Sequence, residues 1–247
     1  MGEGSPALLF LGGWCVNRTV FDDLAKRCAK QRRCLTLDWR GHGESERPVL
    51  DFGAAELLED ALAVVRAGSA ECVVPVALAH SGWVAVELRR KLGDRVPKIV
   101  LLDWLITDAP KPFFEALSGM QSENHWRATV DGIFEQWLHS TNIEKPMRFV
   151  KIEMGAYGFE MWSRAAREIV TAYAIWGRPL DALAQLDPPI PVLHLHGRST
   201  PPSFSEAQQE FARTHTWFRA YELDAQSHFP MFEAPGDMAR LIVEFAG

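Results

Sequence analysis

The sequence predicts an α/β protein in which a mostly parallel sheet is flanked by helices. Apolar strand patterns alternate with helical patterns in the first and last parts of the chain. Each strand candidate is a short apolar run without polar alternation, which is typical of parallel strands covered on both faces. Between residues 111 and 176 the strand signal disappears and helical patterns dominate. These three observations predict one sheet-based core and one helical insertion.

The predicted elements follow one another in the order that a parallel sheet requires. Before the helical insertion they are a strand at 7–11, a helix at 19–30, a strand at 33–38, a helix at 53–67, a strand at 73–78, a helix beginning at Gly82 and a strand at 98–102. After the insertion they are a strand at 192–195, a helix at 205–213, a strand at 217–223 and a helix at 235–245.

The helical stretch predicts a cap that is inserted after the strand ending at Asp103. The proline-rich segment 187–191 restarts the sheet. We therefore predict a core of residues 1–110 and 177–247 and a helical cap of residues 111–176. A chain of 247 residues, 47% of them hydrophobic, can bury one core of this size.

Charge and composition exclude several classes of function. The net charge of −6 argues against a nucleic-acid-binding surface. The chain has no apolar run as long as a transmembrane helix and no signal-peptide pattern, so we expect no membrane association. Four cysteines without metal-binding spacing favour a reduced, cytoplasmic protein. Several of the nine tryptophans lie in the middle third, where they suit an aromatic ligand: Trp104, Trp126, Trp137 and Trp162.

Three motifs are similar to those of the α/β-hydrolase fold. Leu-Gly-Gly-Trp follows the first strand at 11–14, Asp-Trp-Arg-Gly-His-Gly-Glu-Ser occupies 38–45, and Ser-His-Phe-Pro-Met-Phe-Glu-Ala-Pro occupies 227–235. In that fold a nucleophile lies on a strained turn between a strand and a helix, flanked by small residues. The corresponding turn here follows the strand at 73–78.

Steric limits decide which residue occupies the tip of this turn. With Ser81 at the tip, Trp83 would lie two positions later and could not fit between strand and helix. With Ala79 at the tip, the flanking residues are Ala77, Ser81 and Gly82, which are all small. We therefore predict an alanine at the nucleophile position, and acyl transfer through a serine is not expected.

His228 lies between the last strand and the last helix, where this fold places its histidine, and we interpret it as a general base. Such a base needs an acceptor that stabilises its imidazolium form. The commoner position of the acid, after the penultimate strand, has no carboxylate in 195–202. Asp103 occupies the alternative position in this fold, and Asp108 is the second candidate. A helix cap or a surface ion pair is the structural alternative for Asp103.

Backbone groups complete the predicted site. The segment that ends at Trp14 supplies one N–H of an oxyanion hole, and His80, after the tip, supplies the second. Backbone donors do not depend on a serine side chain, so the site can still stabilise developing negative charge.

Two other groups of polar residues are interpreted as structural or inactive. The loop that contains Arg40, His42 and Ser45 orders the edge of the sheet. His194 and His196 share one face of a strand, but without a third ligand nearby they do not predict a metal site.

A combination of short strings resembles the bacterial cofactor-free 2,4-dioxygenases of 3-hydroxy-4(1H)-quinolones from about Ala7 to the C-terminus. The strings are Gly-Trp-Cys at 13–15, Asp-Trp-Arg-Gly-His-Gly at 38–43, Pro-Val at 75–76, His80 with Gly-Trp-Val at 82–84, Leu-Asp-Trp-Leu at 102–105, Ala-Pro-Lys-Pro at 109–112, His-Trp-Arg at 125–127, Phe-Glu-Gln-Trp-Leu at 134–138, His-Phe-Pro at 228–230 and Glu-Phe-Ala at 244–246.

The resemblance implies ring cleavage without a metal or organic cofactor, with molecular oxygen as co-substrate. A dyad of His228 and Asp103 removes the proton of the 3-hydroxyl, and the electron-rich ring then reacts with O2. A bridged peroxide fragments to carbon monoxide and an N-acylanthranilate. Trp14 and His80 would form the oxyanion and O2 pocket. The small aromatic substrate would contact Trp137, Leu78, Val16 and Trp104, in a monomer or weak homo-oligomer.

The chain departs from the family pattern at three pocket positions. The family has Ser-His-Ser-His-Gly at the turn, where this chain has Ala-Leu-Ala-His-Ser at 77–81, and a histidine at the position of Val16. Three polar groups are therefore replaced by Val16, Leu78 and Ala79, which predicts a more apolar substrate.

Two alternative functions remain open from the sequence. The dyad also suits a non-oxidative lyase, isomerase or hydrolase that uses water as its nucleophile. A non-catalytic protein that binds an aromatic ligand is the third possibility. A requirement for O2 and release of carbon monoxide distinguish the dioxygenase from both.

Overall fold

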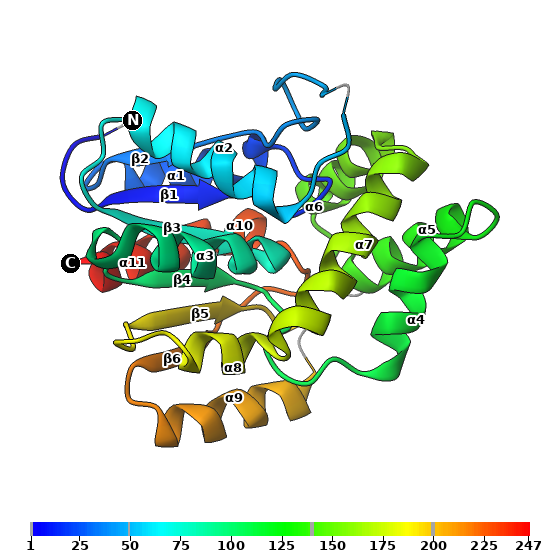
Figure 1. The fold of residues 1–247 in the computed structure, drawn as a ribbon. Coiled ribbons are helices and arrows are strands. Elements are labelled where there is room, and N and C mark those ends of the chain that lie inside the picture. The colour runs from blue at the N-terminus through cyan, green and yellow to red at the C-terminus, as the bar shows by residue number, and fades with distance from the viewer. Residues whose placement is uncertain (1, 49, 139–140, 199–200) are drawn as a thin grey trace.

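The computed structural model describes residues 2–48, 50–138, 141–198 and 201–247. Its six-stranded sheet has the strand order β2-β1-β3-β4-β5-β6, and every pairing is parallel (Figure 1). The strands are β1 (Ala7–Leu11), β2 (Cys34–Thr36), β3 (Val73–Leu78), β4 (Ile99–Leu102), β5 (Val192–His196) and β6 (Phe218–Glu222). The predicted α/β fold with a parallel sheet is confirmed.

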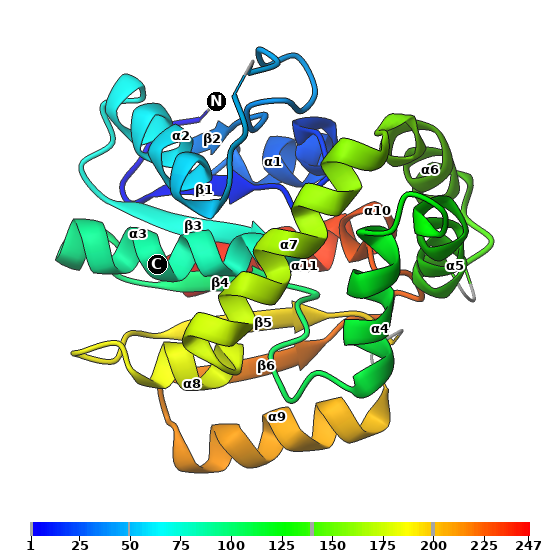
Figure 2. The same cartoon turned by 45° about the vertical axis from the view of Figure 1, so that its right-hand side comes forward.

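Helices cover both faces of this sheet, which explains why the central strands β1, β3 and β4 are continuous apolar runs, whereas the edge strand β6 carries Arg219 and Glu222 at exposed positions. The helices α1 (Asp22–Cys28) and α11 (Pro235–Ala246) lie on one face, and α3 (Gly82–Leu92) lies on the other (Figures 1 and 2). Leu8 and Phe10 of β1 pack with the first pair. Alternate residues of the same strand pack in the second cluster, which also holds residues of α2 (Ala54–Ala67), α8 (Pro179–Ala184) and α9 (Pro202–Thr214).

Most of the helices between β4 and β5, all except α8, lie beyond the carboxyl ends of the strands (Figure 2). They are α4 (Lys111–Met120), α5 (Trp126–Leu138), α6 (Glu144–Arg148), a π-helical turn (Phe149–Glu153), a 3₁₀ turn (Met154–Ala156) and α7 (Phe159–Trp176). Side chains of α7 belong to the clusters on both faces of the sheet. The division into a core and a cap at residues 111–176 stays a prediction.

The main differences from the predicted elements concern where helices begin. The helices α8 and α10 (Pro230–Glu233) are not in the prediction, and α9 begins at Pro202, before the predicted residue 205. Each starts with a proline, which the first turn of a helix tolerates because its N–H groups have no partner within the helix. The strand predicted at 33–38 is shortened to β2, and the first helix is a 3₁₀ turn (Arg18–Phe21) followed by α1.

Within the described ranges, none of the helices is both long and apolar enough to cross a membrane. In the same part of the chain, Cys15, Cys28 and Cys72 form no disulfide.

Candidate active site

Asp103 directly follows β4 and has a strained backbone with φ of +43°. This left-handed conformation is uncommon for residues other than glycine. The side chain is 9% exposed. Its Oδ1 lies 3.4 Å from Nδ1 of His228, and its Oδ2 accepts a hydrogen bond of 3.2 Å from the N–H of Gly197. The end of β4 thus holds a buried carboxylate against an imidazole.

The loop that carries His228 is held by contacts with two other elements. The N–H of His228 donates to the carbonyl of Trp137 at 3.0 Å, and its ring stacks on the Trp137 indole with centroids 4.9 Å apart. The carboxylate of Glu233 accepts hydrogen bonds from the N–H groups of Gln226 and Ser227 at 2.9 and 2.8 Å, and from the Ser227 hydroxyl. These contacts leave His228 few alternative orientations.

The turn after β3 has its strained residue at Ala79, whose φ is +50°. Ser81 has an ordinary helical φ of −65°, and its hydroxyl donates to the carbonyls of Leu11 and Leu78, both at 2.9 Å. A Cβ on Gly82 would lie 2.2 Å from the Trp104 ring, so only glycine fits there. The tip of the turn therefore has no side-chain nucleophile, and the nearby hydroxyl is bonded to the backbone.

His80 follows the tip and lies in an aromatic environment formed by Trp104, Phe113 and Tyr173. Burial and, to a smaller extent, the proximity of His228 lower its pKa to about 3, so the ring is neutral at physiological pH. Trp104 Nε1 donates to Nδ1 of His80 at 3.3 Å, which assigns the His80 proton to Nε2. In the described part of the chain, the backbone N–H groups of His80 and Trp14 donate to no protein acceptor.

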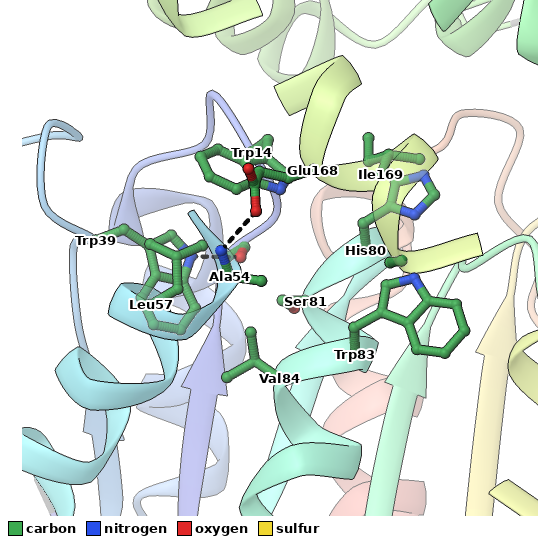
Figure 3. Close-up of a pocket in the computed structure, with 12 residues that line it drawn as sticks. Trp14, Trp39, Ala54, Leu57, His80, Ser81, Trp83, Val84, Glu168 and Ile169 are labelled. Atoms are coloured by element: carbon green, nitrogen blue, oxygen red, sulfur yellow. Dashed lines mark hydrogen bonds between the residues drawn. The ribbon is translucent and has the colours of Figure 1, made fainter. Parts of the chain in front are cut away.

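Trp14 and His80 separate two cavities of very different size. The smaller one, of about 30 Å³, lies between α2, α3 and α7 (Figure 3). Two hydrogen bonds join residues of its wall, from the Ala54 N–H to Glu168 at 2.8 Å and from Trp39 Nε1 to the carbonyl of Gly12 at 2.7 Å. The larger one has a volume of about 370 Å³, and His228 and Asp103 line it. Its volume is within the range of about 300–1,000 Å³ that is typical of small-molecule sites.

The larger cavity gathers the residues that the sequence predicts for the dyad, the oxyanion pocket, the tip of the turn and the substrate contacts. They are Trp14, Val16, Leu78, Ala79, His80, Asp103, Trp104, Trp137 and His228. They come from the ends of β1, β3 and β4, from α5 and from the loop before α10. The structure therefore assembles a His/Asp pair, two free backbone donors and an apolar wall around one cavity.

Known proteins resemble this chain over nearly its whole length. A model of the alpha/beta hydrolase family matches residues 8–241. A 2-heptyl-3-hydroxy-4(1H)-quinolone dioxygenase of Mycobacteroides abscessus is 33% identical, with 96% of this chain and 88% of the relative covered. A 1H-3-hydroxy-4-oxoquinoline 2,4-dioxygenase of Pseudomonas putida is 31% identical, with 98% and 91% covered. A solved structure, described as the basis for recognition and ring cleavage of the Pseudomonas quinolone signal by AqdC, has a TM-score of 0.94 and 33% identity, and covers 100% of this chain and 93% of that chain.

The chain belongs to the 3-hydroxy-4-quinolone 2,4-dioxygenases of the alpha/beta hydrolase family. The family resemblance predicted from the sequence is confirmed.

Asp108 was the second candidate for the acid that pairs with His228, but it lies away from that histidine. Its side chain is 82% exposed and pairs with Arg178 at 3.3 Å. Asp103 is the carboxylate that meets the imidazole. Because its oxygens face His228 and Gly197, it is neither a helix cap nor part of a surface ion pair.

The loop after β2 has the structural contacts expected of it. His42 accepts a hydrogen bond of 3.0 Å from the N–H of Cys15 through Nε2, and its Nδ1 lies 3.0 Å from the carbonyl of Arg40. Burial lowers the pKa of His42 to about 4, which keeps it a neutral acceptor. Arg40 pairs with Asp60 at 2.6 Å, and the Ser45 hydroxyl donates to a backbone carbonyl at 2.7 Å.

Trp126, which was expected to suit an aromatic ligand, contacts Arg127 and Phe159 and is not part of the cavity wall.

Several residues that line the cavity were not identified from the sequence. Residues of α4, α5, α9 and the loop after β4 line the cavity without a motif that predicts it; they include Thr107, Phe113, Met120, Ile133, Gln136, Phe204 and Gln208. Gln208, a polar residue between Phe204 and Phe211 on one face of α9, is a signal that could have indicated this wall.

Proposed function

We propose that this protein is a dioxygenase that cleaves the heteroaromatic ring of a 3-hydroxy-4-quinolone-type substrate and releases carbon monoxide. One observation carries the proposal: the pair of His228 and Asp103 opens onto a largely apolar cavity whose turn residue, Ala79, has no nucleophile. Membership of the 2,4-dioxygenase family supports the same reaction.

The first step is removal of the proton from the substrate's 3-hydroxyl. Nδ1 of His228 faces Asp103, so Nε2 is the nitrogen available to the cavity and acts as the general base. The Asp103 carboxylate stabilises the imidazolium that forms, and the Trp137 indole fixes the plane of the ring.

The second step is the reaction of the substrate anion with O2. The anion supplies the electrons, so neither a metal nor an organic cofactor takes part in the proposed step. New C–O bonds form at C2 and C4 of the ring and give a bridged peroxide. Its collapse breaks the O–O bond and the two bonds to C3, which leaves as carbon monoxide, and both atoms of O2 remain in the N-acylanthranilate. The N–H groups of Trp14 and His80 are suited to stabilise the negative oxygen during these steps.

The cavity wall supports an apolar substituent on the ring. Val16, Leu78 and Ala79 present no polar atom of their side chains near the dyad, and the helical wall adds Phe113 and Met120. The substrate and O2 are the expected partners of a monomer or weak homo-oligomer. Cysteines that form no disulfide support a reduced, cytoplasmic enzyme.

Oxygen consumption and carbon monoxide release test this function. The assay uses a panel of 3-hydroxy-4-quinolones with hydrogen, methyl or heptyl at C2, in air and under anaerobic conditions. We expect O2 uptake and carbon monoxide in equal amounts, with preference for an alkylated substrate. Turnover without O2 would indicate the non-oxidative dyad enzyme. Tight binding without turnover of any substrate would indicate a ligand-binding protein.

A further inference from the structure

His194 of β5 is a buried histidine outside the cavity wall, and both of its ring nitrogens are engaged. Its side chain is 1% exposed. Nε2 lies 3.1 Å from the backbone nitrogen of Trp104, and Nδ1 lies 2.6 Å from Oε1 of Gln208. The Trp104 nitrogen belongs to the peptide bond that immediately follows Asp103. His194 therefore connects α9 with the strained end of β4.

Only one arrangement of protons satisfies these contacts. A backbone N–H can only donate, so Nε2 of His194 must present its lone pair to Trp104. The proton of the neutral ring is then on Nδ1, and Gln208 must accept it through its amide oxygen. The backbone of Trp104 thus determines the tautomer of His194 and the orientation of the Gln208 amide.

The contact matters because the backbone at Asp103 is strained. A left-handed residue of this kind persists only when its surroundings hold it, at a cost of about 1–3 kcal/mol. Without an acceptor at His194, the buried N–H of Trp104 would lose its partner, and the peptide could turn to find another. If the strained φ of Asp103 then relaxes, the rotation about its N–Cα bond turns Cβ together with the carbonyl carbon and moves the carboxylate, which lies 3.4 Å from His228.

We propose that His194 and Gln208 are positioning residues that hold the Asp103–Trp104 peptide so that the Asp103 carboxylate faces Nδ1 of His228. The inference rests on the proposed dioxygenase function. His194 is not part of the cavity wall, so its effect on the reaction is transmitted through the backbone. Gln208 borders the cavity but uses its oxygen to hold His194.

The protonation of His194 agrees with this role. Its pKa is lowered to about 4 because burial and the nearby His196 outweigh the Gln208 hydrogen bond and Asp103, which act in the opposite direction. His194 therefore stays neutral, and able to accept from Trp104, over the range in which the enzyme is expected to work.

Two substitutions of His194 separate positioning from general stability. His194→Leu removes the acceptor, whereas His194→Gln keeps an oxygen that can reach the Trp104 N–H. Below the pKa of the substrate hydroxyl, we expect His194→Leu to lower kcat by up to about 10²-fold with little change in KM, and His194→Gln to retain most of the activity. Above that pKa the substrate is already ionised, so the deficit should disappear.

The pH dependence is the decisive readout. A merely destabilised but folded variant would lose activity equally at every pH, and that result would overturn the proposal. The proposal would also be overturned if the kcat of His194→Leu equalled that of the wild type at a pH below the pKa of the substrate hydroxyl.

Gln208→Glu tests the second member of the pair. The carboxylate still accepts from Nδ1, but its charge favours the doubly protonated ring, which cannot accept from Trp104. We expect this variant to lose activity at a higher pH than the wild type on the acid side. Gln209→Glu is the matched control, because it adds the same charge at an exposed neighbouring position of α9. Equal pH profiles for both variants would contradict the role of Gln208.

Failure of the proposed function can be recognised separately. O2 consumption by the wild type is measured first, because its absence contradicts the dioxygenase and not the positioning pair. In that case the Nδ1 proton of His228 is observed by NMR in the wild type and in His194→Leu. A signal shifted by the carboxylate that disappears in the variant supports positioning, and an unchanged signal overturns it.

Discussion

The carboxyl ends of β3 and β4 lie next to each other in the sheet, and both strands are followed by a residue in the left-handed conformation. The φ angles are +50° at Ala79 and +43° at Asp103. At the first position the side chain is a methyl group, and at the second it is a carboxylate that meets His228. The strained turn at Ala79 therefore persists without a reactive side chain, which is consistent with the proposed use of the backbone N–H of His80.

The two strand ends are also held by different forces. The turn at Ala79 is supported by close packing, in which Gly82 admits the Trp104 ring and Ser81 bonds to two carbonyls. The end of β4 is held by a polar network that includes His194 and Gly197. Substitutions at the end of β4 should therefore impair chemistry, whereas substitutions at the turn should mainly affect stability.

Replacing the base should have the largest effect. We expect His228→Ala to lower turnover by about 10²–10⁴-fold below the pKa of the substrate hydroxyl, because the positioned proton acceptor is lost. O2 uptake over a pH series measures this change. Recovery at high pH is expected, since an ionised substrate needs no base. Near-normal turnover at low pH would show that His228 is not the base.

Loss of the carboxylate should have a smaller effect of the same kind. Asp103→Asn removes the charge that stabilises the imidazolium of His228, so we expect a slower reaction below the pKa of the substrate hydroxyl and recovery above it. The control is Asp108→Asn, at an exposed carboxylate paired with Arg178. If the control variant reproduces the effect and Asp103→Asn does not, the acid has been wrongly assigned.

A buried neutral histidine lies beside each of these strand ends: His80 follows β3, and the ring of His194 contacts the backbone that follows β4. These two histidines give a prediction for stability. The pKa values of His80 and His194 are lowered to about 3 and about 4, below the value of about 6.5 expected in the unfolded chain. The unfolded state therefore binds protons first, and stability should fall as the pH decreases from about 6.5 to about 4. The melting temperature over this range should depend less on pH in His194→Gln. A wild-type melting temperature that is flat over this range would contradict the prediction.

The smallest effect on activity is expected at Ser81. Ser81→Ala removes a hydroxyl that bonds to two carbonyls, so we expect a loss of about 1 kcal/mol in unfolding free energy and nearly unchanged ring cleavage. Serine-directed phosphonates should leave the wild type unlabelled in mass spectra. An adduct on Ser81 would place a nucleophile at the turn and make the protein a hydrolase.

Local patterns predicted most of the sheet but not all of the helix starts. The strand at Val73–Leu78 was predicted with its observed bounds because it is a continuous apolar run that ends at a turn. The helices α8 and α10 were missed because their first residue is proline, and in a local sequence pattern proline indicates a loop. Contacts across the fold stabilise these short helices.

The sequence by itself determined those parts of the site that depend on residues adjacent in the chain. The sizes of Trp83 and Gly82 indicate Ala79 as the tip of the turn, and Asp103 and His228 follow strands that parallel pairing brings to one edge. Only the tertiary structure decided that the Trp137 indole stacks on His228 and that Gln208 reaches His194. These contacts join segments far apart in the chain, and they depend on how the helices pack over the sheet, which no local pattern of residues encodes.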